Sequence, residues 1–173
     1  MEEGFVIWLT GLPCSGKTTL AKMLENWFKL KGYPVERLDG DTIRQGLTAD
    51  LGFNKQDRER NIERVTYVAK LLSRNGIVVI AAFVSPYREM RQKIRQEVTN
   101  YIEIYVACDL DVCIQRDVKS MYNKAMRGEI NDFTGASDLY EEPYCPDVIV
   151  HTDKQTEEES FKNILIYLEE IWL

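Results

Sequence analysis

"GLPCSGKTT", residues 11–19, is the stretch that decides the fold of this 173-residue chain. It matches the pattern G-x-x-x-x-G-K-[ST] and lies between an apolar run, "FVIWL" (5–9), and a helical pattern. In this context successive backbone N–H groups and a helix N-terminus form a phosphate-binding loop. We therefore predict that seven residues of the loop bind a nucleotide: Gly11, Cys14, Ser15, Gly16, Lys17, Thr18 and Thr19.

Two side chains of this loop have the chemistry that phosphoryl transfer needs. The ammonium group of Lys17 is expected to neutralise the β- and γ-phosphate oxygens, which makes it a candidate catalytic residue. The hydroxyl of Thr18 is expected to be a ligand of Mg²⁺. Catalysis of this kind depends mainly on positioning and on neutralising charge.

The regions outside the loop alternate between apolar runs and helical patterns, which is typical of a parallel sheet with helices on both faces. We predict an α/β fold of about five strands, in one domain that spans residues 1–173. The expected strands are 5–9, 35–39, 77–84, 101–107 and 147–150. The expected helices lie near 17–31, 57–74, 87–98, 110–117 and 157–172. The polar, Gly-broken segment 116–140 is predicted to be a mobile lid.

Composition excludes several classes of partner and site. The net charge of −6 argues against a nucleic-acid or membrane-surface partner, because both require a basic face. The four cysteines form no C-x-x-C motif and the chain has one histidine, so a zinc site is not expected. Reduced thiols favour a cytoplasmic location.

The second predicted strand ends in "LDGDTIR", residues 38–44, which brings two carboxylates to the end of the sheet where α/β proteins bind ligands. We predict that Asp41 orients or deprotonates the acceptor hydroxyl and helps to hold the metal. The alternative is a purely local role in the turn or in capping a helix, because Asp-Gly is a strong turn pair.

Several cationic and aromatic residues are candidates for the acceptor site. Arg44, Arg58 and Arg88 can bind an anionic acceptor, and Asn61 shares a helix face with Arg58. We expect Arg91 and Arg95 to be solvated surface residues. Two aromatic residues in polar loops, Phe53 and Phe133, either stack on a base or pack locally.

The string "NKQD", residues 54–57, matches the guanine-binding motif of GTPases, but its place in the chain does not. No strand precedes it, and the third predicted strand ends in "FVSPYR" rather than in a switch motif. We therefore keep a GTP-binding switch only as a remote alternative. Asp57 is predicted instead to cap the N-terminus of the next helix.

From residue 5 nearly to the C-terminus, the chain resembles the adenylyl-sulfate kinase family. The matching segments, in the order and spacing of the family, are "GLPCSGKTT", "LDGDTIRQGL", "DLGFNKQDRERNIERVTYVAKL", "FVSPYR", "RDVKSMYNKAMRGEINDFTG" and "YEEPYCPDVIV". The resemblance implies a P-loop kinase that uses ATP and Mg²⁺ to phosphorylate the 3′-hydroxyl of adenylyl sulfate. The products would be 3′-phosphoadenylyl sulfate and ADP. A P-loop kinase for another small anionic acceptor is the alternative within the same class.

The resemblance also implies roles for individual residues. Phe53 and Phe133 would lie on the two faces of the substrate adenine, and Ser85 matches a serine described in the family as a phosphoserine intermediate. In-line transfer needs no such intermediate, so Ser85 is expected first as a contact and second as a phosphate acceptor. The other substrate-binding residues that the resemblance implies are Asp41, Arg44, Arg58, Asn61, Val84 and Lys119. Because many members of the family are dimers, a homodimer is compatible with the resemblance.

Overall fold

The computed structural model describes residues 4–172, and its centre is a parallel sheet. The strands are β1 (Val6–Thr10), β2 (Val35–Asp39), β3 (Val78–Ala82), β4 (Tyr101–Ala107) and β5 (Val148–His151). They lie in the order β2-β3-β1-β4-β5, and all four pairings are parallel. The α/β fold and its five predicted strands are therefore confirmed, with small shifts at the strand ends.

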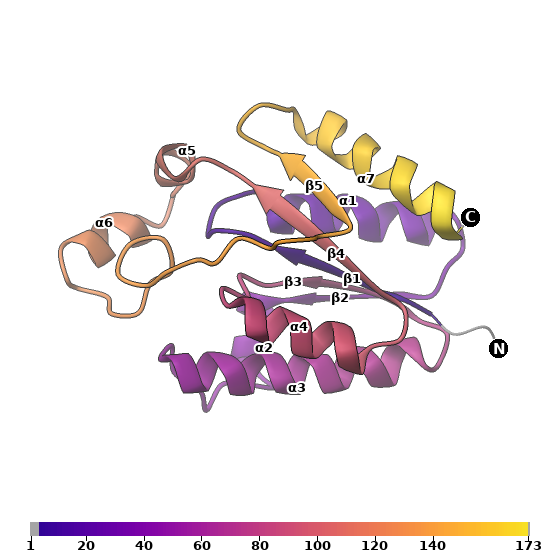
Figure 1. The fold of residues 1–173 in the computed structure, drawn as a ribbon, viewed down its shortest axis with the longest axis horizontal. Helices are drawn as coiled ribbons and strands as arrows, with labels where there is room; N and C mark the ends of the chain where they lie inside the picture. The colour runs from indigo at the N-terminus through magenta and orange to yellow at the C-terminus, as the bar shows by residue number, and fades with distance from the viewer. Residues whose placement is uncertain (1–3, 173) are drawn as a thin grey trace.

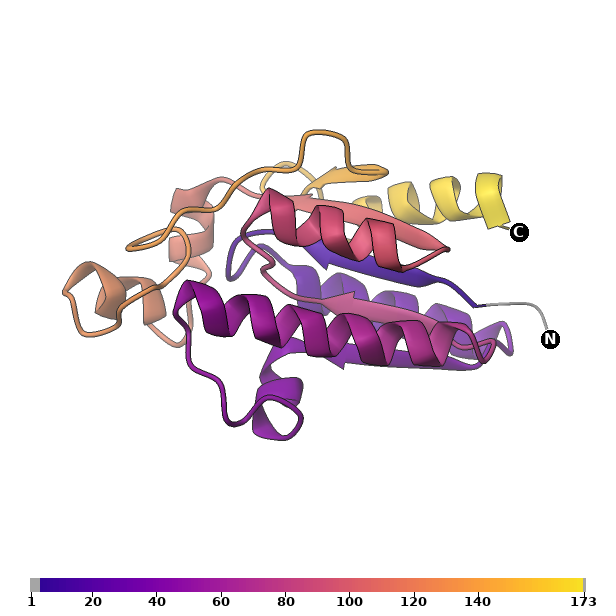
Figure 2. The same ribbon diagram turned by 60° about the horizontal axis from the view of Figure 1, so that its bottom comes forward.

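Helices cover both faces of the sheet (Figure 1). They are α1 (Lys17–Leu30), α2 (Gly40–Gln45), α3 (Lys55–Ser73), α4 (Arg88–Glu97), α5 (Leu110–Gln115), α6 (Met121–Met126) and α7 (Glu157–Trp172). Helices α1 and α7 lie on one face, and α3 and α4 lie side by side on the other (Figures 1 and 2). Within residues 4–172, none of these helices is long and apolar enough to cross a membrane.

The central strand β1 shows why this sequence requires helices on both faces. Its side chains alternate, so Ile7 and Leu9 join the core beneath α1 and α7, while Val6 and Trp8 join the core beneath α3 and α4. All five residues of β1 are buried. A strand at this position is buried on both faces, so its sequence is a continuous apolar run.

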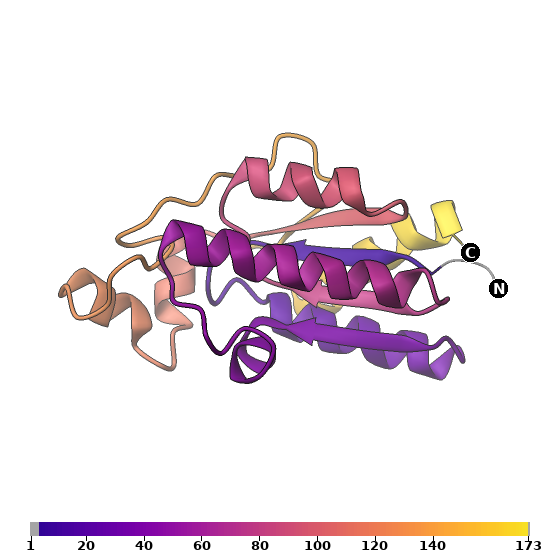
Figure 3. The same ribbon diagram turned by 90° about the horizontal axis from the view of Figure 1, so that it is seen from below.

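All five strands run toward the same end of the sheet, where the loops that carry the candidate residues meet. The phosphate loop follows β1 at the centre, and α2 follows β2 directly (Figure 3). Helices α5 and α6 and the segment after them project from this end (Figure 1). Ligands of open parallel sheets bind at this end, beside the point where the strand order reverses.

Two short helices were not predicted from the sequence. Helix α2 starts immediately after β2, where the side chain of Asp39 caps it by accepting a hydrogen bond from the N–H of Asp41. Helix α6 lies inside the segment 116–140 and buries Tyr122 and Ala125. Each helix has only six residues, too few to show a helical repeat in the sequence.

The predicted cap of the next long helix was wrong. Helix α3 begins at Lys55, and Asn54 is its cap, because the Asn54 side chain accepts from the N–H of Asp57 at 2.9 Å. Asp57 lies one turn further on, and its carboxylate accepts from the Gly52 N–H at 3.0 Å. The string "NKQD" therefore stabilises the loop that leads into α3, through the hydrogen bonds of Asn54 and Asp57.

Candidate active site

The phosphate loop joins β1 to α1, and its backbone is built around two glycines. Gly11 has φ of 154°, and a Cβ there would lie 2.5 Å from the carbonyl oxygen of Val106. Gly16 caps α1 with φ of 100°. Between them, Cys14 has φ of 62° and an exposed side chain, and Ser15 is buried. The first turn of α1 then carries Lys17, Thr18 and Thr19.

Lys17 lies buried in the curve of this loop. Its ammonium group donates hydrogen bonds to the carbonyl oxygens of Gly11 and Leu12, at 3.0 and 2.6 Å. Burial lowers the pKa of Lys17 from its ordinary value of 10.5 to about 8. An anionic phosphate bound in the loop would therefore strongly favour the charged form of Lys17.

The structure joins Thr18 to Asp39, a carboxylate to which the sequence analysis gave no metal role. The Thr18 hydroxyl donates to Asp39 Oδ2 at 3.0 Å, and Asp39 is almost fully buried at the end of β2. Mg²⁺ takes oxygen ligands and is usually held by one or two carboxylates together with substrate phosphates. A hydroxyl and a carboxylate side by side at the phosphate loop fit that requirement.

Asp41, which was predicted to share the metal site, lies in a different environment. Its side chain is 80% exposed, and its carboxylate pairs with the Lys119 ammonium at 3.2 Å. This contact joins the first turn of α2 to the segment 116–140. Asp41 is therefore open to an acceptor from solvent, whereas Asp39 faces the phosphate loop.

An arginine and a phenylalanine form an exposed platform near α2. The Arg44 guanidinium lies 4.2 Å from the centre of the Phe53 ring and donates to the carbonyl oxygens of Leu51 and Gly52. The Phe53 side chain is 57% exposed, so the local-packing alternative does not describe it. A flat, cation-backed ring is a suitable surface for a base.

Arg58 and Asn61, one helical turn apart on α3, hold the loops around this platform. Arg58 donates to the Phe53 carbonyl at 2.6 Å, to the Thr134 hydroxyl at 2.7 Å and to the Asp132 carbonyl. Asn61 is buried, and its Oδ1 accepts from the Thr48 hydroxyl at 2.7 Å. In this structure Arg58 joins α3 to the segment 116–140, while Asn61 fixes the loop after α2.

Val84 and Ser85 follow β3 and are held by two residues of β1. Thr10 donates to the Val84 carbonyl at 2.7 Å, and the Trp8 indole N–H donates to the Ser85 hydroxyl at 2.9 Å. Ser85 is 2% exposed and has φ of 44°, in the left-handed region. A serine that is buried and already accepts a hydrogen bond is poorly placed to receive a phosphoryl group.

The segment 116–140 reaches back to the phosphate loop through Tyr122. The Tyr122 hydroxyl donates to the Pro13 carbonyl at 2.9 Å, and its ring contacts Phe133 edge-on at 5.0 Å between ring centres. Burial raises the pKa of Tyr122, so the phenol stays protonated as a donor. The sequence analysis did not identify Tyr122, because a buried tyrosine within a polar segment has no distinctive spacing.

Two of the three arginines of α4, Arg88 and Arg91, differ from their expected roles. Arg88 donates to the Glu142 carbonyl and lies over the Tyr144 ring at 3.9 Å, so it contacts the segment before β5 and not the other predicted arginines. The prediction of a solvated surface position is wrong for Arg91, which is buried, but it is confirmed for Arg95, which is exposed. Arg91 is 2% exposed, and Arg95 pairs with Asp147 at 2.5 Å.

The chain shows clear similarity to one protein family. Residues 3–151 match the family described as Adenylylsulphate kinase. The chain is 57% identical to the probable adenylyl-sulfate kinase of Pseudomonas aeruginosa, over 95% of this chain and 77% of that protein. It is 52% identical to the adenylyl-sulfate kinase of Halothermothrix orenii, over 98% of this chain and 91% of that protein.

A solved structure supports the same assignment. The Mycobacterium tuberculosis APS kinase CysC, in complex with AMPPNP and APS, superposes with a TM-score of 0.93 at 35% identity. The superposition covers 98% of this chain and 99% of that one. The resemblance found in the motifs is thus confirmed, and the chain belongs to the adenylylsulphate kinase family.

Proposed function

We propose that this protein transfers the γ-phosphoryl group of ATP to the 3′-hydroxyl of adenylyl sulfate. The observation that carries this proposal is the meeting of two features at one end of the sheet. One is the phosphate loop with its buried Lys17, and the other is the exposed Phe53 ring backed by Arg44. The first suits the phosphates of a donor, and the second suits the base of an anionic acceptor. The structure of the Mycobacterium tuberculosis APS kinase CysC contains a corresponding pair of ligands, AMPPNP and APS.

On the donor side, we assign the nucleotide phosphates to the backbone of residues 11–16 and to Lys17. The residues that would hold Mg²⁺ are Thr18 and Asp39, supported by their 3.0 Å contact, with Asp41 as a further candidate. When bound, Mg²⁺ would offset negative charge on the transferring phosphoryl group. Lys17 would contribute the protein's own positive charge at that point.

On the acceptor side, we assign the adenine to Phe53 and Phe133, and the phosphosulfate to the neighbouring cations. The pKa of Arg44 is lowered, mainly by burial and then by the positive charge of Arg58 nearby. Two like charges held together in this way are stabilised by an anion. The remaining acceptor contacts in the proposal are Asn61, Val84, Ser85 and Lys119.

The chemical step would be a direct in-line transfer. Asp41 accepts the proton of the 3′-hydroxyl, and the 3′-oxygen forms a bond to the γ-phosphorus. The bond from that phosphorus to the β,γ-bridging oxygen breaks, and its electron pair leaves with ADP. Lys119 would orient the Asp41 carboxylate, because the two groups pair at 3.2 Å.

The test is a transfer assay with ATP and GTP as donors, and with adenylyl sulfate and AMP as acceptors. Fast formation of 3′-phosphoadenylyl sulfate from ATP, with AMP nearly inert, would support the proposal. Transfer to a different anionic acceptor would instead support a P-loop kinase with another substrate. A strong preference for GTP with slow hydrolysis and no transfer would favour a switch.

Asp41→Asn gives a second test at the level of one residue. The side chain is exposed, so the variant should fold and bind ATP normally. Its kcat should fall by about a hundredfold or more if Asp41 is the base. Near-normal turnover would remove Asp41 from the mechanism.

The proposal includes a cytoplasmic location and a single kinase domain over residues 1–173. All four cysteines are free, which suits a reducing compartment. A homodimer stays a prediction, to be tested by light scattering of the purified protein.

A further inference from the structure

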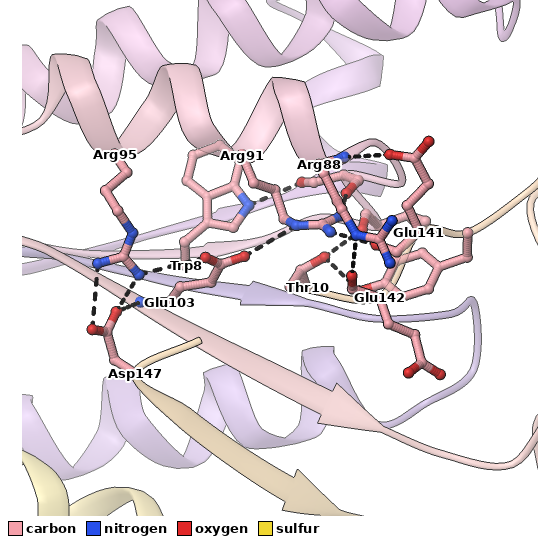
Figure 4. A network of polar contacts seen from close by, with 12 residues as sticks. Trp8, Thr10, Arg88, Arg91, Arg95, Glu103, Glu141, Glu142 and Asp147 are labelled. Carbon is pink, nitrogen blue, oxygen red and sulfur yellow. Dashed lines mark hydrogen bonds and ion pairs between the residues drawn. The ribbon is translucent and has the colours of Figure 1, made fainter. Parts of the chain in front are cut away.

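Arg91 is a buried cation that the mechanism above does not use. Its side chain is 3% exposed, and its Nε lies 3.0 Å from Oε1 of Glu103, whose side chain is 7% exposed. The contact is an ion pair without hydrogen-bond alignment, and it involves Nε, so NH1 and NH2 of the guanidinium can donate elsewhere. Figure 4 shows Arg91 between α4 and the strands, with Glu103 beside it. Burying two charges is costly, so such a pair calls for an explanation beyond stability.

The other two nitrogens of the Arg91 guanidinium bind backbone on both sides of it. NH1 donates to the carbonyl of Ser85 at 2.5 Å, and NH2 donates to the carbonyl of Glu141 (Figure 4). One rigid planar group therefore joins the loop after β3 to the segment that leads back to β5. Only an arginine has donors arranged to do both and still face a carboxylate.

Three successive carbonyls of the loop after β3 accept hydrogen bonds from other parts of the chain. The Val84 carbonyl accepts from Thr10, the Ser85 carbonyl from Arg91, and the Pro86 carbonyl from the Glu141 N–H at 2.8 Å. The Ser85 backbone has φ of 44°, a conformation that costs energy and persists only where the surrounding structure enforces it. Arg91 is the side chain that holds the carbonyl of this strained residue.

We propose that Arg91 is a positioning residue: it fixes the Val84–Ser85 backbone against the acceptor, with Glu103 orienting its guanidinium. This inference rests on the proposed function, in which Val84 and Ser85 contact adenylyl sulfate. Arg91 is buried and is not one of the proposed substrate contacts. Its loss should therefore weaken acceptor binding while leaving the ATP site intact.

Arg95 offers a matched control on the same helix. It also pairs with Glu103, at 3.5 Å, and lies over an aromatic ring, that of Tyr101, at 5.1 Å. Its other partner is Asp147, however, and within residues 4–172 no hydrogen bond or ion pair joins Arg95 to the loop after β3. Figure 4 shows Arg95 at the opposite side of Glu103 from Arg88.

The experiment compares Arg91→Lys with Arg95→Lys in the purified protein. Lysine keeps a positive charge but has one nitrogen in place of three, so it cannot reproduce the arrangement in which separate nitrogens face Glu103 and the two carbonyls. Arg91→Lys should raise KM for adenylyl sulfate by about tenfold, since a hydrogen bond from a charged group is lost, and should leave KM for ATP within about twofold. Arg95→Lys should leave both constants near the wild-type values. Equal kinetic constants for the two variants would overturn the inference.

A double variant separates positioning from stability. Arg91→Met/Glu103→Gln removes both buried charges, so it avoids leaving one of them unpaired. We expect it to fold and still to show the raised KM for adenylyl sulfate. A wild-type KM in this variant would mean that Arg91 acts only through stability, and would overturn the inference. No transfer to adenylyl sulfate by the wild-type protein would instead overturn the proposed function, and the role of Arg91 with it.

Discussion

Replacing Ser85 with alanine tests whether this serine carries the phosphoryl group or only shapes the site. The Ser85 hydroxyl accepts a 2.9 Å hydrogen bond from the indole N–H of Trp8, and both side chains are buried. If transfer is direct, the hydroxyl is dispensable for chemistry, and kcat should fall by less than about fivefold. If the serine is a phosphorylated intermediate, the same variant should lose transfer almost completely.

The effect on stability can be estimated from the same contact. Ser85→Ala leaves the Trp8 N–H without its acceptor in the core, which costs about 2 kcal/mol. For a chain of this length, that loss should lower the Tm by about 6 °C. The double variant Trp8→Phe/Ser85→Ala removes both polar atoms and should recover part of the loss, since Phe retains a ring against Phe83.

The assay combines thermal unfolding with steady-state kinetics and a rapid acid quench of enzyme mixed with γ-labelled ATP. We expect a lowered Tm, a near-normal kcat and no label on the protein. A folded Ser85→Ala variant with no activity would refute the reasoning. Label that remains on wild-type protein but not on the variant would do the same.

Three further predictions concern the platform, the lid segment and the phosphate loop. Phe53→Ala should raise KM for adenylyl sulfate by about tenfold through loss of stacking, whereas the exposed Arg60→Ala should have little effect; equal constants for the two would show that Phe53 is not a binding surface. Tyr122→Phe should lower the Tm by about 3 °C, because the Pro13 carbonyl loses its donor; an unchanged Tm would contradict this contact. The Lys17 ammonium loses its proton as the pH rises through about 8, so ATP affinity should fall above that pH, by up to about tenfold per pH unit. Calorimetry at pH 9 in two buffers should detect proton uptake on binding, and a pH-independent affinity would contradict the lowered pKa.

The sheet could be predicted because its strands are buried on both faces and therefore appear as continuous apolar runs. The boundaries of β2 and β4 match the prediction, and the others shift only slightly. Helices α2 and α6 could not be predicted, because each depends on tertiary contacts more than on its own pattern. The Lys119–Asp41 and Tyr122–Pro13 contacts could not be predicted for the same reason, because they join segments that are distant in the sequence.

The candidate site was predictable where a motif fixes the local backbone, as in the phosphate loop. It was less predictable where a charged residue meets a partner far along the chain. Arg91 was expected on the surface, yet it is buried against Glu103. A signal was present: Glu103 is the single charged residue in "YIEIYVA", a strand that is otherwise apolar or aromatic, so a buried cation had to face it. Asp39 was missed as a partner of Thr18 because only the fold brings β2 alongside the start of α1.

The central position of β1 has a consequence for how the chain is made. This strand is synthesised before the other four strands, and its partners Val79 and Tyr101 lie far along the chain, in β3 and β4. Such long-range parallel pairing is slow, and it leaves the apolar β1 without neighbours while translation continues. The nucleotide-binding loop therefore cannot take its final shape on the ribosome until β4 has emerged. Competence to bind the nucleotide therefore comes later in biosynthesis than the residues responsible, which precede β2 to β5 in the chain.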